Sequence, residues 1–171
     1  MIRARRVSAG GLTFVGPTAE VLERLGDKVT ARGLAAECGV PVLPGTHSTT
    51  GLEEARAFFS TLPSGHAMVI KAVAGGGGRG MRIVRRSEDI DAAYQRCASE
   101  AQAAFGSEAL YVEQLVDRAR HVEVQILGDH AGAVNHLWER ECTLQRRHQK
   151  LVELAPSPSL TSSLRDALLA A

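Results

Sequence analysis

The sequence predicts an α+β fold made of helices and antiparallel hairpins. Helix-like and strand-like segments follow one another in mixed order, without the strict β-α alternation that a parallel sheet requires. Two pairs of strand-like segments are joined as hairpins: 68–71 with 81–84 across a glycine run, and 121–127 with 132–138 across Gly128-Asp129-His130. Only 4% of the residues are aromatic, so we expect a core made mainly of Ala, Val, Leu and Ile.

The N-terminal part predicts one short strand and three helices. Residues 1–6 are basic and unpatterned, whereas the apolar run 12–15, ended by Gly16-Pro17, predicts a strand end and a turn. Thr18 and Asp27 are suitable N-caps, and stop signals follow each segment. We therefore expect helices over 18–25, 27–37 and 52–60, with a linker or hinge in the Pro-, Gly-, Ser- and Thr-rich segment 41–51.

The rest of the chain predicts a long helix, further strands and a C-terminal helix. Ser87 is a suitable cap for a helix reaching Phe105, whose apolar residues recur at helical spacing. Strands are expected over 110–116 and 151–154, and a last helix from Thr161 to Ala171.

Composition and charge exclude several broad classes of protein. The formal net charge is +1, which gives no global attraction to nucleic acid or to an anionic membrane. No apolar run is long enough to span a bilayer. The three cysteines are far apart, lack metal-ligand spacing and follow no secretory leader, so we expect reduced thiols in a cytoplasmic protein.

The glycine run Gly75–Gly80, interrupted only by Arg79, suggests a phosphate-binding loop. Glycine lets the backbone approach a ligand closely, and concave stretches of backbone N–H groups suit phosphate oxygens. The loop is not a Walker A motif, because Lys-Ser/Thr does not follow, and a strand rather than a helix comes after it. The alternative is a merely flexible hairpin tip. Lys71, at the end of the preceding strand, favours the phosphate interpretation, since it would hold the phosphates that the loop covers.

A second polar constellation lies further along the chain. His121, Glu123 and Gln125 alternate on one predicted strand, so their side chains should share a face, which by default is a solvated one. Segment 139–150 crowds five basic residues and two glutamates together. Such a run is usually a solvated face or a disordered tail, but the flanking strands favour an ordered anion site. Both interpretations stay open on the residues alone.

Seven motifs, in order and at family-like spacing, resemble those of the biotin carboxylases, enzymes of the ATP-grasp type. The resemblance runs from about Leu12 to Pro158. Its most specific parts are the glycine-rich segment 75–81, called the flap in this family, and the 145–150 motif. Related carboxylases for acetyl-CoA, propionyl-CoA, pyruvate and urea share this module, so the acyl acceptor is not identified. The motifs are Phe14-Val15-Gly16-Pro17, Gly26-Asp27-Lys28, Gly39-Val40-Pro41-Val42, Ile70-Lys71-Ala72, the flap 75–81, the segment 120–125 and Gln145-Arg146-Arg147-His148-Gln149-Lys150.

The resemblance implies an activity and a set of site residues. Such enzymes use MgATP to phosphorylate bicarbonate and then carboxylate biotin on a carrier domain. A carboxyltransferase component is a further partner, and a homo-oligomer is possible. The residues implied are Lys28 and Lys71 at the phosphates, Gly77 and Gly78 in the flap, Glu113, Gln114, Leu115 and Val116 in a hinge that reads adenine, His121 near the ribose, Gln145 and His148 facing the ribose and phosphates, and Lys150, which helps to hold bicarbonate, as the catalytic residue.

The departures from the family pattern predict a fragment. The family has an N-terminal α/β domain before this segment, and two magnesium-binding glutamates, a glutamate base and an arginine after it. Residues 1–41 would then end the N-terminal domain and add connecting helices, 42–116 would form the ATP-grasp flap lobe, and 117–171 would begin an incomplete second lobe. Magnesium ligands would lie outside this chain, which by itself should be inactive and at best a weak nucleotide binder.

Two alternatives remain beside this interpretation. A carbamoyl-phosphate synthetase-like ligase would keep the flap and use an amine acceptor, although the full 145–150 motif speaks against it. A non-enzymatic docking module would leave the amides of the glycine loop silent when ATP is added.

Overall fold

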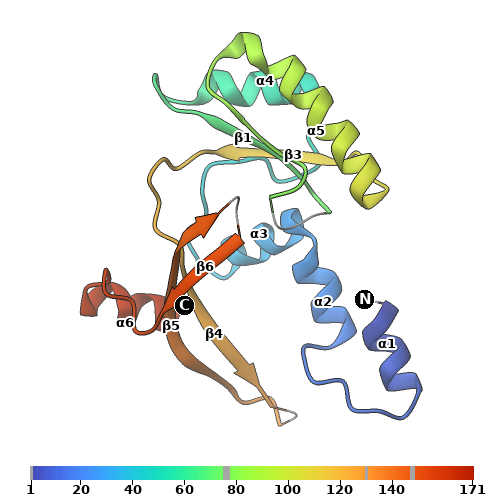
Figure 1. The fold of residues 1–171 in the computed structure, drawn as a ribbon, viewed down its shortest axis with the longest axis vertical. Coiled ribbons are helices and arrows are strands. Elements are labelled where there is room, and N and C mark those ends of the chain that lie inside the picture. The colour runs from blue at the N-terminus through green and yellow to red at the C-terminus, as the bar shows by residue number, and fades with distance from the viewer. Residues whose placement is uncertain (1, 75–77, 130, 147–148) are drawn as a thin grey trace. The chain divides into compact units, whose positions relative to one another are not determined.

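The computed structural model describes residues 2–74, 78–129, 131–146 and 149–171, which form two compact units. The first comprises Met1–Leu115 and the second Val116–Ala171. Figure 1 shows helices and antiparallel strands in mixed order along the chain, so the predicted α+β class is confirmed.

A three-stranded antiparallel sheet in the order β2-β1-β3 is the centre of the first unit. Helices α4 and α5 cover one of its faces (Figure 1), and the core between them is aliphatic, with Ile70, Met68 and Leu110 fully buried. The elements are α1 (Ile2–Ala9), α2 (Ala19–Gly26), α3 (Lys28–Glu37), α4 (Leu52–Thr61), β1 (Met68–Ala72), β2 (Met81–Val84), the short 3-10 helix η1 (Ser87–Asp89), α5 (Ile90–Phe105) and β3 (Leu110–Gln114).

Local capping signals explain the helix starts in this unit. The Thr18 hydroxyl accepts a hydrogen bond from the Val21 amide at 3.3 Å, and the Asp27 carboxylate accepts one from the Thr30 amide at 2.8 Å. Each cap satisfies a backbone N–H that the helix itself leaves without a partner. The predicted helices over 18–25 and 27–37 are therefore confirmed to within one residue.

Two predictions for the N-terminal part are wrong. The run 12–15 is not a strand, and Leu12 and Val15 are exposed, because an apolar run becomes a strand only where another strand can pair with it. The basic start instead forms α1, which an ion pair between Arg5 and Glu23 links to α2.

The segment 44–50, predicted as part of a linker or hinge, is ordered along the outer edge of β3. The amides of Gln114, Thr46 and Thr50 donate to the carbonyls of Pro44, Val112 and Leu110, at 2.8, 2.9 and 2.8 Å. These bonds occupy backbone groups that an edge strand would otherwise leave open. The segment thus fixes β3 rather than acting as a hinge.

The second unit is a three-stranded antiparallel sheet in the order β4-β5-β6, followed by α6. Its elements are β4 (Val122–Gly128), β5 (Val134–Arg146), β6 (Gln149–Leu154) and α6 (Ser162–Ala170). The predicted hairpin 121–127 with 132–138 is confirmed, and β5 continues through the charged residues up to Arg146. This part of segment 139–150 is therefore ordered strand rather than a disordered tail. Among the described residues, no helix is long and apolar enough to cross a membrane.

We expect the core of the first unit to depend on Ile70. Its side chain is fully buried, so Ile70→Ala should lower the free energy of unfolding of this unit by about 2–5 kcal/mol through lost burial and the cavity left behind. Ile83→Ala on the neighbouring strand β2 is the matched control, because Ile83 is 48% exposed and should cost about 1 kcal/mol or less. Urea titration followed by the amide NMR signals of β1 measures both, and equal losses would contradict the assignment of the core.

Candidate functional site

In the first unit, four charged side chains meet beside β1 and β3. Lys71, on β1, forms an ion pair with Glu113, on β3, and Arg32, on α3, reaches the other oxygen of the same carboxylate at 3.1 Å. Lys28, the first residue of α3, donates from Nζ to the Ala72 carbonyl at 2.9 Å. The charge of Asp27 also acts on Lys28, so three cations and two carboxylates still leave this place with a net positive charge.

The two lysines affect each other electrostatically. Burial lowers the pKa of Lys28 below 10.5, and the nearby charge of Lys71 lowers it further, because both disfavour the charged ammonium. An anion bound between the two amines would relieve this repulsion. The arrangement therefore suits a polyanion such as a phosphate chain.

The glycine loop ends at the same place. The Ala72 amide donates to the Gly80 carbonyl at 2.7 Å, while the Ala72 carbonyl accepts from Lys28. Gly80 has φ +62°, and a Cβ there would lie 2.8 Å from the Ala72 side chain, so the position requires glycine. Gly78 has φ +77°, a conformation that glycine favours. Gly77 lies outside the described residues.

The four residues predicted to read adenine lie at the end of the first unit and the start of the second. The Glu113 carboxylate is buried and already paired with Lys71 and Arg32. The Gln114 and Leu115 amides donate to the carbonyls of Pro44 and Ala67, each at 2.8 Å. Val116, which begins the second unit, is 45% exposed. The carboxylate and these two amides are therefore engaged within the fold.

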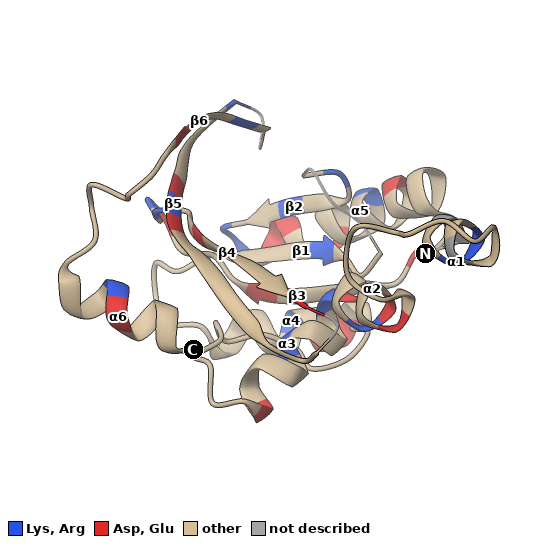
Figure 2. Cartoon of the chain, turned by 90° about the horizontal axis from the view of Figure 1, so that it is seen from below, with Lys and Arg blue, Asp and Glu red and all other residues tan. Residues whose placement is uncertain are grey.

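In the second unit, Glu123 is the centre of a second charged cluster. Its carboxylate accepts from Arg140 Nε at 2.7 Å, pairs with Lys150 Nζ and lies 3.2 Å from His121 Nε2. Acidic and basic residues follow one another along β5 (Figure 2), and β6 carries Lys150 and Glu153. The cluster brings together the predicted residues His121 and Lys150 through a glutamate that was not itself predicted as a site residue.

The ring of His121 is held from both sides. Gln145 Nε2 lies 3.1 Å from His121 Nδ1 and also donates to the Cys142 carbonyl at 2.9 Å, which identifies it as the amide nitrogen. Because an amide NH₂ only donates, His121 Nδ1 accepts, and the ring proton resides on Nε2, which donates to Glu123. His121 and Gln145 are therefore adjacent, and their roles at a ligand stay predictions. His148 lies outside the described residues.

Of the predicted row of His121, Glu123 and Gln125, the first two side chains contact each other. The pairing of β4 with β5 shifts register between Val124 and Ile126, where two steps along β4 oppose three along β5, so the extra residue of this bulge lies in β5. The Gln125 amide donates to the carbonyl of Ile126 at 3.2 Å instead of joining the cluster.

The charges of the second cluster stabilise one another. The hydrogen bond from Lys150, with further contributions from Arg140, lowers the pKa of Glu123 from 4.5 to about 2. The same hydrogen bond, donated by Lys150 to Glu123, raises the pKa of Lys150. At neutral pH both groups are ionised, and Lys150 is held as a fixed cation.

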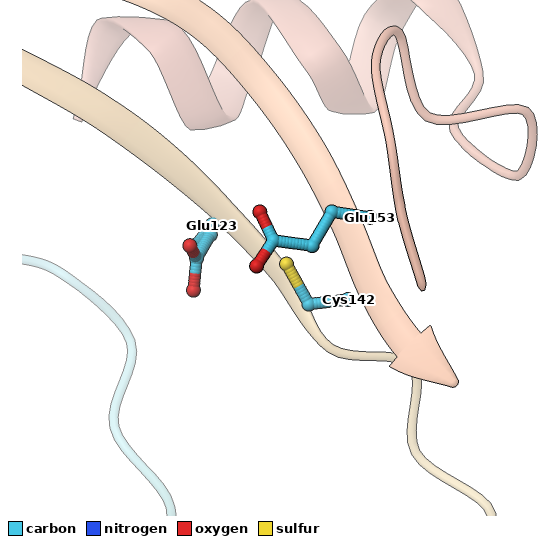
Figure 3. A group of neighbouring side chains, drawn as sticks. All are labelled: Glu123, Cys142 and Glu153. Atoms are coloured by element: carbon cyan, nitrogen blue, oxygen red, sulfur yellow. The ribbon is translucent and has the colours of Figure 1, made fainter. Parts of the chain in front are cut away.

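One group of possible metal ligands occurs in the described part of the chain, formed by Glu123, Cys142 and Glu153 (Figure 3). Their ligand atoms lie within 4.8 Å of one another. Mg²⁺ prefers oxygen ligands in octahedral geometry, whereas this set includes a buried thiol. Both carboxylates are also paired with Arg140, so the set does not fit magnesium.

The chain contains only three lysines, and all three are predicted site residues: Lys28, Lys71 and Lys150. The other seventeen basic residues are arginines. The absence of lysine from all other positions of the sequence is therefore a signal that could have pointed to these three residues. By contrast, the pairings of Arg32 with Glu113 and of Arg140 with Glu123 span 81 and 17 residues, so no local pattern identified them.

Comparisons with known proteins agree with the predicted resemblance. The model of the family described as carbamoyl-phosphate synthase L chain, ATP binding domain, matches residues 27–171. A pyruvate carboxylase from Aspergillus niger is 51% identical over 168 residues, which is 98% of this chain but 14% of that protein.

Solved structures give the same result. A biotin carboxylase–β-γ-ATP complex from Campylobacter jejuni has a TM-score of 0.92 at 38% identity, and the biotin carboxylase domain dimer of a Hydrogenobacter thermophilus 2-oxoglutarate carboxylase, with MgADP, ADP and bicarbonate, has 0.91 at 40%. Each match covers 98% of this chain and 37% of the other. The predicted biotin carboxylase resemblance and ATP-grasp fold are thereby confirmed. The roles of individual site residues stay predictions.

We expect the carboxyl group of Glu123 to titrate near pH 2. Because its pKa is lowered in the folded state, the Lys150 pair stabilises the second unit above pH 4.5, and this contribution is lost as the pH falls toward 2. Lys150→Met should move the titration midpoint back toward 4.5, since it removes the largest cause of the shift. Carboxyl ¹³C NMR against pH measures both midpoints. A midpoint that Lys150→Met leaves unchanged would contradict the pairing.

Proposed function

Because the chain belongs to the family of carbamoyl-phosphate synthase L chain ATP-binding domains, we propose that it is the ATP-binding part of a biotin carboxylase. In the whole protein, MgATP and bicarbonate would serve to carboxylate biotin on a carrier domain. The chain spans 14% of the length of its curated relatives, the pyruvate carboxylases, so this activity is a proposal for a larger polypeptide.

The observation that carries the proposal is the pair of lysines at the end of β1. Lys28 and Lys71 come from different elements, and each lowers the cost of binding phosphate oxygens because its position is fixed before the ligand arrives. The carbonyl of Gly80 is bonded to Ala72 beside them, which supports a flap that closes over the same ligand. Phosphoryl transfer depends mainly on such positioning and on positive charge around the oxygens.

Lys150 would hold bicarbonate in the second unit. Bicarbonate is a planar anion, and the Glu123 contact keeps the Lys150 ammonium charged and in place. Arg140 supplies a second cation beside the same carboxylate. His121 and Gln145, which contact each other, would face the nucleotide as a unit.

The two lysines fit the phosphates of ATP, whereas the group of Glu123, Cys142 and Glu153 does not fit magnesium. The two lysines match a phosphate chain, whereas the thiol-containing group at Glu123 does not match the oxygen ligands of Mg²⁺. Bound magnesium would neutralise developing charge on the phosphates, and we propose that its ligands lie outside these residues. We assign no residue here to biotin.

The partners and the location follow from the same proposal. A biotin carrier domain and a carboxyltransferase component would act with the whole protein, and a homo-oligomer is consistent with the dimer named for one structural relative. The cytoplasmic location stays a prediction, since two rodent relatives are named as mitochondrial.

The isolated chain is expected to be inactive. Because it covers 37% of the Campylobacter jejuni and Hydrogenobacter thermophilus biotin carboxylase chains, we expect no bicarbonate-dependent ATP hydrolysis from these 171 residues by themselves.

The proposed domain roles keep the predicted boundaries: 1–41 as the end of an N-terminal domain with connecting helices, 42–116 as the flap lobe, and 117–171 as the start of a second lobe.

Two alternative functions were left open by the sequence. A carbamoyl-phosphate synthetase-like ligase shares the name of the family model, but the Aspergillus niger relative is a pyruvate carboxylase. A docking module would leave the two fixed lysines without a ligand.

An ATP titration tests the proposal. Adding ATP should shift the amide NMR signals of Gly78 and Gly80, and Lys71→Met should weaken ATP binding at least about tenfold, the equivalent of one lost charge-assisted hydrogen bond. Arg56→Met is the matched control: Arg56 is a cation of the same unit, but it pairs with Glu53 and Asp91 on the surface and should leave the affinity unchanged.

Two outcomes would contradict the proposal. The first is that ATP leaves the signals of Gly78 and Gly80 unmoved while the chain binds a biotin carrier domain tightly, which favours docking. The second is that Arg56→Met weakens ATP binding as much as Lys71→Met, which indicates nonspecific attraction by positive charge.

A further inference from the structure

Two glutamates of β5 are buried although the second unit has little apolar core. Glu139 and Glu141 are 2% and 6% exposed, and they flank Arg140, whose side chain pairs with Glu123. Successive residues of a strand point to opposite faces of the sheet. Glu139 and Glu141 therefore lie on the face opposite Arg140 and the cluster that contains Lys150 and His121. Burying a carboxylate is costly unless it is fully hydrogen-bonded.

Glu141 receives hydrogen bonds at both of its oxygens. Oε2 accepts from the hydroxyls of Ser157 at 2.8 Å and Ser159 at 2.5 Å. Oε1 accepts from Arg120 Nη1 at 2.7 Å and from the Thr143 hydroxyl at 3.1 Å. These four donors lower the pKa of Glu141 to about 2, so the group is ionised at neutral pH.

One of these bonds leads directly to His121. The Thr143 hydroxyl, which donates its proton to Glu141, accepts a hydrogen bond from the His121 amide at 3.0 Å. The His121 carbonyl accepts in turn from the Cys142 amide at 2.7 Å. His121 lies just before β4, so the hydroxyl supplies a bond to this amide outside the strand itself.

We propose that Thr143, oriented by Glu141, is a positioning residue that fixes the backbone of His121 and thereby keeps its ring between Glu123 and Gln145. The inference rests on the proposed function, in which His121 faces the nucleotide. An ionised glutamate accepts only, so it forces the Thr143 hydroxyl to donate to it and leaves the hydroxyl lone pairs for the His121 amide.

The test replaces Thr143 in the 171-residue chain. Thr143→Val removes the hydroxyl, whereas Thr143→Ser keeps it. With Val, the ¹⁵N signals of the His121 ring should lose the signature of a single tautomer protonated at Nε2, and ATP should bind about five- to tenfold more weakly, the effect of one hydrogen bond. With Ser, the ring signals should be retained and the affinity should stay within about twofold.

Ser159→Ala is the matched control. It removes a different hydroxyl from the same carboxylate of Glu141, on the oxygen that does not bond Thr143. We expect this variant to leave the His121 ring signals and the ATP affinity unchanged. A purely structural role of the network would instead make Ser159→Ala resemble Thr143→Val.

The outcomes separate this inference from the proposed function. If the unsubstituted chain binds no ATP, the proposed function fails, while the ring signals still decide the role of Thr143. Retained ring signals in Thr143→Val, or their loss in Thr143→Ser, would overturn the inference. Should Thr143→Val unfold the second unit, hydrogen exchange of the His121 amide in the unsubstituted chain decides: slow exchange supports the hydroxyl bond, and exchange as fast as in a free peptide overturns it.

Discussion

Two like-charged amines held close together at the end of one strand are the constraint on which the candidate site depends. Lys71 is fixed by Glu113 on the neighbouring strand, and Lys28 by the carbonyl of Ala72, so neither can move away from the other without breaking a contact. Burial lowers the pKa of Lys28, and repulsion by Lys71 lowers it further. A fold that maintains such repulsion supplies a place where an anion binds favourably, because the cost of bringing the cations together is already met.

The rest of the first unit serves to hold these groups. Antiparallel pairing places Lys71 opposite Tyr111, two residues from Glu113, and the 44–50 segment bonds along β3 and fixes that strand. Gly80 permits the close approach that closes the hairpin at Ala72. The second unit holds its charged groups in place by different contacts. It exposes large apolar side chains, among them Leu137, Trp138 and Leu151, and buries carboxylates bonded to hydroxyls and arginines.

Much of the fold was predictable because its signals are local. The caps Thr18 and Asp27 each act within three residues, and the two hairpins are marked by turn or glycine residues between apolar runs. The 12–15 strand was wrong because strand formation depends on a partner that the local sequence does not reveal. The charged segment could not be decided for the same reason: its order comes from pairing with β4 and β6.

The site was predictable in part, and through motifs rather than geometry. The resemblance supplied Lys28, Lys71, His121, Gln145 and Lys150, and the structure shows contacts within each unit that make these residues plausible neighbours of a ligand. It did not supply Arg32, Arg140 or Thr143, whose partners are set by strand register and by helix placement. The bulge in β5 opposite Gln125 is likewise invisible in an alternating pattern.

The titration of the Lys28 amine tests the central claim most directly. ¹⁵N NMR of the Nζ signal should give a midpoint below 10.5 in the free chain, because burial and Lys71 disfavour the charge. ATP should raise that midpoint, since phosphate oxygens favour the charged ammonium. An ordinary midpoint in the free chain that ATP leaves in place would contradict the claim that these two amines form a prepared anion site.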